Sequence, residues 1–304
     1  MTILVTGGLG TIGMALVPEL RKRGLPVMLC DLYHHHDENY RRCDVSEYRQ
    51  LENLFTEGIP YEYVYHLAAE FGRWNGEAFY ENLWRTNVIG TKNLLRLQEK
   101  LGFRMIFFSS SEVYGDWPGI MSEDVMEFNE IKQLNDYAMT KWVGEMQCIN
   151  SAVMHSTETV RVRLFNTYGP GEYYSPYRSV ICRFIYCAIK GLPYTVYLGH
   201  NRTSTYITDT VRTLANIMDT FVPGEVYNIG GTRYHSIKEL SDLVLEYTGG
   251  DPGLVSYEEA EPFTTKDKMV DTRKAQAHLR HECRVSLEEG IRRTVDWMRS
   301  MYID

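Results

Sequence analysis

The run Thr6-Gly7-Gly8-Leu9-Gly10-Thr11-Ile12-Gly13 joins a short apolar segment to an amphipathic one. Glycine at 7 permits a tight turn, glycine at 10 lets the backbone approach a pyrophosphate, and glycine at 13 lets a helix pack closely on a sheet. The free N–H groups and the positive end of the helix dipole then bind phosphate. The run predicts a strand–turn–helix unit that binds a dinucleotide through Gly7, Gly10, Thr11, Ile12 and Gly13.

Short β-rich segments alternate with helical patterns through the first half of the chain. Strands are expected at Met1–Thr6, Pro26–Asp31, Tyr63–Leu67, Arg104–Ser109 and Thr159–Phe165, and helices at Gly13–Arg23, Ala78–Leu101 and Tyr137–Met154. This alternation implies parallel strands joined by right-handed crossovers. The expected fold class is therefore α/β, a Rossmann-type doubly wound parallel sheet.

The pattern changes after Phe165. Tyr168–Arg178 is rich in glycine, proline and tyrosine and predicts an irregular loop, followed by short helices and strands. Ser286–Met301 has apolar residues at helical spacing and predicts a final amphipathic helix. We expect a dinucleotide-binding domain over residues 1–165 and a smaller, mainly substrate-binding lobe, interwoven with the first, over residues 166–304.

The composition restricts the partners of the chain. Its 304 residues carry a net charge of −8 without a long lysine or arginine run, which argues against nucleic acid or an anionic membrane as a partner. The sequence contains no stretch of ~18 apolar residues, so we expect no membrane span. It also lacks the pattern of a secretory signal, so we expect no secretion. The six cysteines form no CxxC pair, which is typical of a cytoplasmic chain with reduced thiols.

Three adjacent histidines, His34-His35-His36, lie in a polar stretch after the second expected strand. Adjacent side chains on a loop point in different directions, so they are poorly arranged to share a metal ion. We expect a surface loop here and no metal site.

Acidic residues follow the second expected strand. A carboxylate at Asp31, where this strand ends, accepts hydrogen bonds from an adenosine ribose and repels a 2′-phosphate, which favours NAD over NADP. Asp44 and Val45 are candidates for the adenine edge, although a solvated position explains them equally well. The expected cofactor is NAD.

Tyr137-Ala138-Met139-Thr140-Lys141 places a phenol and an ammonium on one face of a helix. A free tyrosine has a pKa near ~10 and is a poor base at neutral pH. A nearby Lys⁺ and the positive nicotinamide of NAD⁺ would stabilise the phenolate. Tyr137 would then accept the proton of a sugar hydroxyl while a hydride leaves for the cofactor.

A serine-rich run, Ser109-Ser110-Ser111-Glu112-Val113-Tyr114-Gly115, comes after the strand expected at Arg104–Ser109. In an open parallel sheet the carboxyl ends of the strands face the ligand crevice. A serine hydroxyl there can hydrogen-bond the substrate hydroxyl that Tyr137 deprotonates, whereas a serine-rich turn is the alternative.

Together these motifs resemble extended short-chain dehydrogenases/reductases, the family of NAD-dependent nucleotide-sugar epimerases, dehydratases and decarboxylases. The resemblance extends over nearly the whole chain, through His66-Leu67-Ala68-Ala69, Thr86-Asn87-Val88-Ile89-Gly90-Thr91, Arg163-to-Pro170, Arg202-to-Asp209 and Leu287-to-Ile291. It implies a nucleotide-diphosphate sugar as substrate.

The resemblance also implies roles for individual residues. Further residues of the cofactor site would be Leu67, Ala68, Ala69, Ser109 and Phe165. Asn87 would support the strand ends near the cofactor, and Lys141 would hold the nicotinamide ribose. Ser110 would be the hydroxyl partner of Tyr137. On the substrate side, Asn166 would lie near the phosphates and Arg202 would pair with the diphosphate.

Two departures from the family pattern affect the substrate. Lys268-Met269-Val270-Asp271 has lysine, without a proline, where the family often has arginine two residues before a Pro-Asp pair. The loop Gly171–Arg178 is unusually aromatic and lacks the Asn-Asn pair of several relatives, so the nucleotide base stays open. Arg178 is a candidate ligand for a diphosphate or a sugar carboxylate, with a solvated loop arginine as the alternative.

The subclasses share oxidation of a sugar hydroxyl, usually at C4, and differ in the chemistry of the keto intermediate. A 4-epimerase needs only Tyr137 and Ser110 with room for the sugar to rotate, and it is the first expectation. The pair Ser111-Glu112 resembles GDP-mannose 4,6-dehydratases and UDP-glucuronate decarboxylases, so dehydration and decarboxylation through Glu112 stay open. A non-catalytic dinucleotide-binding protein is the alternative of another class, although such relatives typically lack the tyrosine or the lysine.

The family also suggests a homodimer that packs two helices from each subunit. The candidate helices are the one after Ala78 and the one carrying Tyr137. Apolar residues on them are Leu83, Leu94, Trp142 and Met146. Core packing explains these residues equally well.

Overall fold

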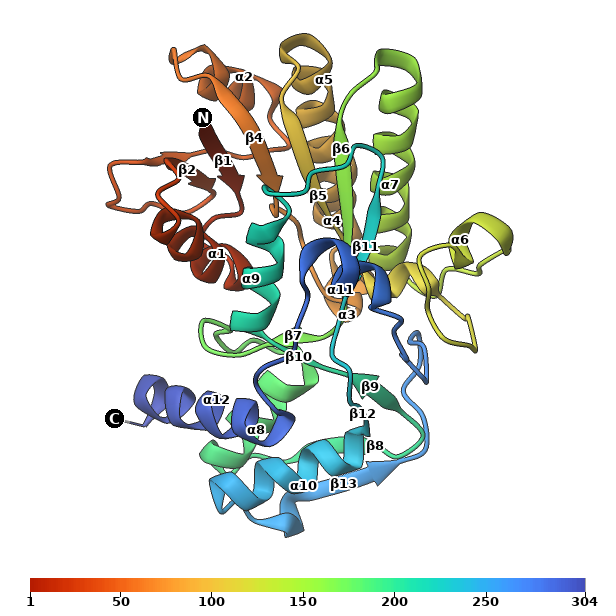
Figure 1. Ribbon diagram of the computed structural model, residues 1–304. Coiled ribbons are helices and arrows are strands. Elements are labelled where there is room, and N and C mark those ends of the chain that lie inside the picture. Colours follow the sequence, from red (N-terminus) through yellow and green to blue (C-terminus); the bar gives the residue numbers. More distant parts are fainter. Residues whose placement is uncertain (304) are drawn as a thin grey trace.

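A seven-stranded sheet forms the centre of the molecule (Figure 1), in a computed structural model that describes residues 1–303. The strand order is β11-β6-β5-β4-β1-β2-β3, and each neighbouring pair is parallel. The strands are β1 (Thr2–Thr6), β2 (Val27–Asp31), β3 (Tyr40–Arg42), β4 (Tyr61–His66), β5 (Arg104–Ser110), β6 (Thr159–Leu164) and β11 (Val226–Ile229). This topology confirms the expected fold class.

Helices cover both faces of the sheet because alternate strand residues point to opposite faces. Ile3 and Val5 pack in the core cluster that includes α1 (Thr11–Lys22) and α9 (Ile207–Asn216). Leu4 packs in the other cluster, formed with α2 (Tyr48–Thr56), α5 (Thr91–Leu101) and α7 (Asp136–His155). The two buried clusters fix the register of the sheet and direct the carboxyl ends of its strands to one edge.

The helix expected at Ala78–Leu101 is not one regular α-helix. It runs from α4 (Tyr80–Trp84) through a π-helical segment, Arg85–Gly90, into α5. A short helix, α3 (Arg73–Ala78), precedes it. A Cβ added at Gly90 would lie 2.8 Å from Cγ2 of Val45, so the segment packs closely on the chain that leaves β3.

The second half of the chain forms a lobe and also returns to the sheet (Figure 1). The loop after β7 (Thr167–Tyr168) leads to α8 (Val180–Lys190), and β10 (Thr205–Tyr206) pairs with β7. The remaining elements of the lobe are β8 (Tyr194–Tyr197), β9 (Asn201–Thr203), β12 (Tyr234–Ser236), α10 (Ile237–Thr248), β13 (Val255–Glu258) and α12 (Leu287–Tyr302). Between them, α9 and β11 belong to the layers of the central sheet, as does α11 (Arg273–Leu279), which lies against β11.

The surface of α7 carries several exposed apolar side chains. Met139, Met146, Ile149 and Val153 are exposed, whereas Leu83 and Leu94 are completely buried. The suggestion that Leu83 and Leu94 form a subunit contact is therefore wrong, because both belong to the interior of one chain. Across residues 1–303, no helix is both long and apolar enough to span a membrane.

Candidate active site

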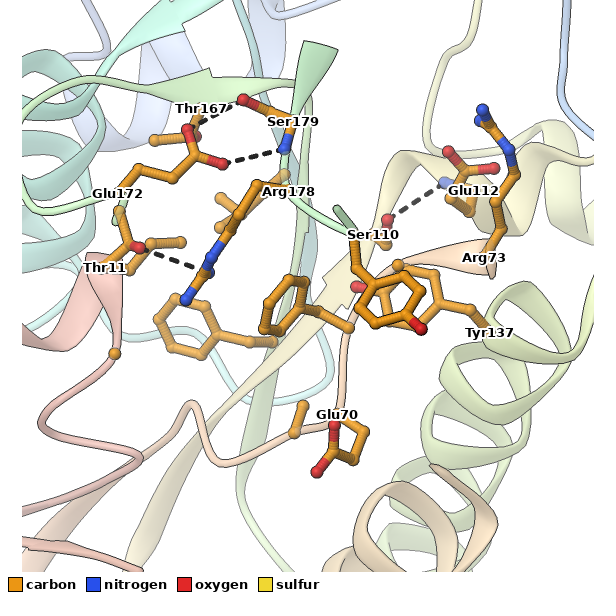
Figure 2. A pocket seen from close by; sticks show the side chains of 18 of the residues that line it. Thr11, Glu70, Arg73, Ser110, Glu112, Tyr137, Thr167, Glu172, Arg178 and Ser179 are labelled. Atoms are coloured by element: carbon orange, nitrogen blue, oxygen red, sulfur yellow. Dashed lines mark hydrogen bonds between the residues drawn. The ribbon is translucent and has the colours of Figure 1, made fainter. Parts of the chain in front are cut away.

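A cavity of about 820 Å³ lies at the carboxyl edge of the sheet, between the sheet and the C-terminal lobe. Figure 2 shows part of its wall. The wall includes these residues predicted from the sequence: Gly7, Gly10, Thr11, Ile12, Gly13, Asp31, Asp44, Val45, Leu67, Ala68, Ala69, Ser109, Ser110, Ser111, Glu112, Tyr137, Lys141, Asn166, Arg178, Arg202 and Lys268. The structure thus brings residues from both halves of the chain around one space.

Two predicted cofactor residues, Asn87 and Phe165, lie behind this wall. The Asn87 side chain is buried; its Oδ1 accepts the Glu70 N–H at 2.9 Å and its Nδ2 donates to Thr140 Oγ1 at 3.0 Å. Phe165 is completely buried against Tyr114. Neither side chain lines the cavity, so Asn87 can support the wall from the interior as the resemblance implies, and a cofactor contact of Phe165 stays a prediction.

The glycine turn leaves an open, uncapped helix end. Gly7 has a φ of 68°, and a Cβ there would lie 2.6 Å from the Ala68 nitrogen. A Cβ at Gly13 would lie 2.6 Å from the Gly7 carbonyl oxygen, so only glycine lets α1 start so close to β1. No side chain caps α1, and its first N–H groups are therefore available to a phosphate.

Asp31 lies next to the glycine turn in the same cavity. Its Oδ2 accepts the Leu9 N–H at 3.0 Å and its Oδ1 accepts the Leu32 N–H at 2.7 Å. These bonds hold the carboxylate against the glycine turn and leave lone pairs on both oxygens for ribose hydroxyls. The uncapped helix and this oriented carboxylate fit a dinucleotide without a 2′-phosphate, which is NAD.

Lys141 faces the cavity one turn after Tyr137 on α7. Its Nζ donates a hydrogen bond to the Phe108 carbonyl oxygen at 2.9 Å and lies 5.9 Å from the centre of the Tyr137 ring. Burial lowers the pKa of Lys141 to about 8. The ammonium is therefore held by the end of β5 and titrates close to neutral pH.

Tyr137 itself is held in the protonated state by the protein. Burial raises its pKa to about 12, a hydrogen bond with Ser110 acts in the opposite direction, and the charge of Glu112 raises the pKa further. The lowering expected from Lys141 is absent. Deprotonation of Tyr137 therefore requires positive charge beyond what the chain provides.

The serine run turns sharply at the end of β5. The Ser110 hydroxyl accepts the Glu112 N–H at 3.2 Å and so caps a short 3₁₀ helix, Ser111–Tyr114. This turn directs Ser110 and Glu112 into the cavity, where Figure 2 shows them on the same side as Tyr137. The geometry places the hydroxyl and the carboxylate close to the phenol.

A buried ion pair fixes this turn from below. Glu145 is completely buried and accepts hydrogen bonds from Ser109 Oγ at 2.5 Å and from Arg163 Nε and Nη2, each at 2.9 Å. Arg163 also donates to Tyr114 Oη at 2.9 Å. The Glu145–Arg163 pair therefore holds both ends of the serine run in place, Glu145 at Ser109 and Arg163 at Tyr114.

Glu112 forms an ion pair with Lys268, although 156 positions separate the two residues. Burial opposes ionisation of Glu112, but the charge and hydrogen bond of Lys268, together with the charges of Arg73 and Arg202, lower its pKa to about 2. Burial lowers the pKa of Lys268 to about 8 against the pull of Glu112. The site thus contains a carboxylate and an ammonium in direct contact.

The other predicted substrate residues divide between the two ends of the cavity. Arg202 is buried beside Glu112; its Nη1 donates to the Lys266 carbonyl oxygen at 2.7 Å, and burial lowers its pKa. Asn166 Nδ2 donates to the Thr203 carbonyl oxygen at 3.0 Å. Arg178 instead points towards the glycine turn, with Nη1 3.5 Å from Thr11 Oγ1 (Figure 2).

Sequence reasoning missed four charged residues of the site. Arg73 and Glu261 form an ion pair at the cavity wall, and Glu145 and Arg163 form the pair beneath it. Glu145 comes four positions after Lys141 on a helix, a spacing that could have indicated its direction towards β5. Arg73 lies at the start of the short helix α3, and no periodicity or motif in the sequence marks it.

The fold and this site define an NAD-dependent enzyme of the extended short-chain dehydrogenase/reductase class. Residues 3–230 match the model of the NAD dependent epimerase/dehydratase family. The chain belongs to this family, as the sequence resemblance predicted, and the non-catalytic alternative is set aside.

Curated relatives and solved structures cover almost the whole chain. UDP-N-acetyl-alpha-D-glucosaminuronate decarboxylase of Bacillus cytotoxicus is 32% identical over 99% of this chain and 98% of the relative. UDP-glucuronic acid decarboxylase 1 of Xenopus tropicalis is 30% identical over 98% of this chain and 72% of the relative. UDP-glucuronic acid 4-epimerase of Bacillus cereus superimposes with a TM-score of 0.88 at 26% identity, covering 99% of this chain and all of the other.

Proposed function

We propose that the chain decarboxylates a UDP-linked uronic acid. The observation that carries the proposal is the Glu112–Lys268 ion pair inside the cavity, next to Tyr137 and Ser110. Simple epimerisation does not require such a pair, whereas loss of carbon dioxide requires a proton donor for the carbon left behind. The UDP and the uronic acid come from the names of the two decarboxylases that are 32% and 30% identical.

Tyr137 begins and ends the reaction as a proton carrier. The phenolate accepts the proton of the C4 hydroxyl, and the Ser110 hydroxyl hydrogen-bonds the same oxygen. The glycine turn and Asp31 would hold NAD⁺, which would supply a hydride acceptor for C4 and positive charge near the Tyr137 phenolate. The product of this step is a 4-keto uronate, in which the carboxylate is β to the ketone.

The ketone makes the carboxylate a leaving group. When the bond between C5 and C6 breaks, its electron pair moves into an enolate on C5, C4 and O4, and carbon dioxide departs. Lys268, which Glu112 keeps protonated near neutral pH, donates a proton to C5. Tyr137 then returns its proton to O4 when C4 is reduced, so the cofactor is regenerated.

The other residues of the cavity are assigned to the phosphates of the substrate and to the cofactor. Arg202 and Asn166 are proposed to bind the diphosphate side of the substrate, Arg202 by paired donors suited to phosphate. Arg178 is proposed to contact phosphate at the Thr11 end of the cavity, where the uncapped α1 begins. Asp44 and Val45 remain proposed contacts of the adenine.

Epimerisation at C4 is the second candidate, favoured by the fold of solved relatives. UDP-glucose 4-epimerase of Thermotoga maritima superimposes with a TM-score of 0.89 at 28% identity, over 99% of both chains. Tyr137 and Ser110 alone would serve this reaction, and Glu112 would then be a bystander. A 4,6-dehydration through Glu112 differs in releasing water instead of carbon dioxide.

Product mass separates these reactions. The purified protein with NAD⁺ is incubated with UDP-glucuronate, with its N-acetylglucosaminuronate analogue, and with UDP-glucose, and the products are measured by liquid chromatography and mass spectrometry. Loss of carbon dioxide from a uronate is the expected result. A new product of unchanged mass would establish epimerisation, and loss of water would establish dehydration; either would reject the decarboxylase proposal.

We also propose a cytoplasmic homodimer. The exposed apolar side chains of α7, including Met146 and Ile149, form a surface that a second copy would bury. All six cysteines are free thiols, as a reducing compartment favours. Sedimentation of the wild type and of Ile149→Glu tests the dimer; a monomeric wild type would reject it.

A further inference from the structure

Arg73 enters the cavity from the segment after β4, for which the sequence predicted no element. It is the first residue of α3 and comes directly after Gly72, whose φ of 87° turns the chain inward after β4. Its side chain is only 16% exposed, and Figure 2 shows it beside Glu112, on the wall away from Arg178. The residue is therefore at the sugar end of the cavity, on the opposite side from the glycine turn.

The charges around Arg73 leave this end of the cavity positive. Arg73, Arg202 and Lys268 face Glu112 and Glu261, which is three cations against two carboxylates. His200 lines the same wall, and burial lowers its pKa, so it adds no charge at neutral pH. Arg73 pairs with Glu261 and Lys268 pairs with Glu112, so Arg202 is the cation in excess. With Arg202 assigned to the diphosphate, what remains free at the sugar end is a hydrogen-bond donor of Arg73.

One nitrogen of the Arg73 guanidinium is paired and another is free. Nη2 pairs with Glu261, which also accepts a hydrogen bond from Trp74 Nε1 at 3.2 Å. Trp74 in turn packs edge-on against Phe263. The Nε–H of Arg73 is buried and has no acceptor among residues 1–303, and such a buried donor is destabilising unless a ligand accepts its hydrogen bond.

We propose that Arg73 binds the carboxylate of the sugar and makes the enzyme selective for uronates over neutral hexoses. The inference rests on the proposed UDP-sugar substrate and names the residue that recognises its second acidic group. A carboxylate oxygen accepts the free Nε–H, while Glu261 holds the guanidinium in place through Nη2. Glu112, on the same wall, then repels the bound carboxylate and favours its departure as neutral carbon dioxide.

Equilibrium binding to matched ligands tests Arg73 separately from turnover. Tyr137→Phe is used as the background so that the bound sugar is not converted, and the protein is saturated with NAD⁺. Isothermal titration then gives Kd for UDP-glucuronate and UDP-glucose, which differ only in the carboxylate at C6. The same two constants are measured after adding Arg73→Met or Arg73→Lys.

Arg73→Met is expected to raise the Kd for UDP-glucuronate by roughly 10- to 100-fold, the range of a charge-assisted hydrogen bond. The Kd for UDP-glucose should stay within about threefold of its original value. Arg73→Lys should restore part of the affinity for UDP-glucuronate, because lysine provides the positive charge but lacks the paired N–H donors of a guanidinium. Unchanged UDP-glucose binding also shows that the variant is folded. An equal loss for both ligands, or no loss for either, would overturn the inference.

The result is independent of the reaction. If Arg73→Met abolishes the preference for the uronate but wild-type protein releases no carbon dioxide, the carboxylate site stands and the decarboxylase proposal fails. If wild-type protein releases carbon dioxide and Arg73→Met keeps the preference, the decarboxylase proposal stands and the assignment of Arg73 fails.

Discussion

Replacing Glu112 by glutamine removes the charge that keeps Lys268 protonated. Two charges about 4 Å apart at an effective dielectric constant of about 20 interact by about 4 kcal/mol. One pKa unit corresponds to about 1.36 kcal/mol, so the loss of Glu112 should lower the pKa of Lys268 by about one to three units. Starting from about 8, the pKa of Lys268 falls to about 5–7, so about half or more of this lysine is neutral at pH 7.

The expected result is a fall in kcat with a shifted pH profile. Removing a general acid lowers the rate by about 10²- to 10⁴-fold. In the wild type, activity should decline as pH rises through about 8, because Lys268 loses its proton there. In Glu112→Gln that decline should move to lower pH, so the remaining activity is recovered by acidification.

The assay is carbon dioxide release from UDP-glucuronate between pH 5.5 and 9 (roughly three units around the pKa of Lys268). Lys268→Met and the double variant are measured in parallel, since residues that act as a unit are strongly non-additive. Glu127→Gln, on an exposed helix remote from the cavity, is the control. The reasoning is refuted if Glu112→Gln keeps wild-type kcat and the same alkaline limb.

Three further changes test other parts of the site. Tyr137→Phe should reduce turnover by about 10²- to 10⁴-fold while NAD binding, monitored by fluorescence, stays intact; full activity would reject the proton carrier. Asp31→Ala should weaken the binding of NAD by roughly 10- to 100-fold, because two charge-assisted hydrogen bonds to the ribose are lost. It should also narrow the preference of the enzyme for NAD over NADP; an unchanged Kd for NAD would contradict the ribose contact. Arg163→Met should lower the free energy of unfolding by about 3–5 kcal/mol, because Glu145 stays buried without its cation; denaturant melts should show partial recovery when Glu145→Leu is added, and a loss below about 1 kcal/mol would reject the buried ion pair as a major support.

Local motifs predicted the strands around the cofactor half of the site and most of the residues that line its wall. The glycine run and the alternation of strands and helices depend on neighbours a few residues apart, and the structure contains the expected strands within a few residues of their predicted ends. Tyr137 and Lys141 share a helical face, which their spacing alone indicates. The π-helical segment at Arg85–Gly90, which ends in close contact with Val45, was not predicted, because the spacing of apolar residues does not distinguish it from an α-helix.

The substrate half depends on contacts distant in sequence. Lys268 was noted only as a departure from the family pattern, yet it pairs with Glu112 across the cavity. The pairs Arg73–Glu261 and Glu145–Arg163 likewise join separate elements. Charge pairing of this kind is set by the tertiary fold, so no short window of sequence contains it.

The pKa of Tyr137 illustrates a further limit. Spacing correctly places Lys141 near the phenol, but the lysine amine donates to the Phe108 carbonyl oxygen, and burial raises the pKa of Tyr137 to about 12. The energetic balance depends on solvent exclusion, which residue types alone do not give.

The return of β11 to the sheet restricts how specificity can be exchanged among relatives. Val226–Ile229 closes the edge of β6, so a fragment ending at residue 165 would expose an unpaired strand and invite aggregation. Transplanting residues 166–304 as one block would replace part of the scaffold together with the sugar-binding wall. Grafts that respect the architecture would be confined to loops such as 70–79 and 169–178, whose ends are anchored on the recipient's own sheet and helices.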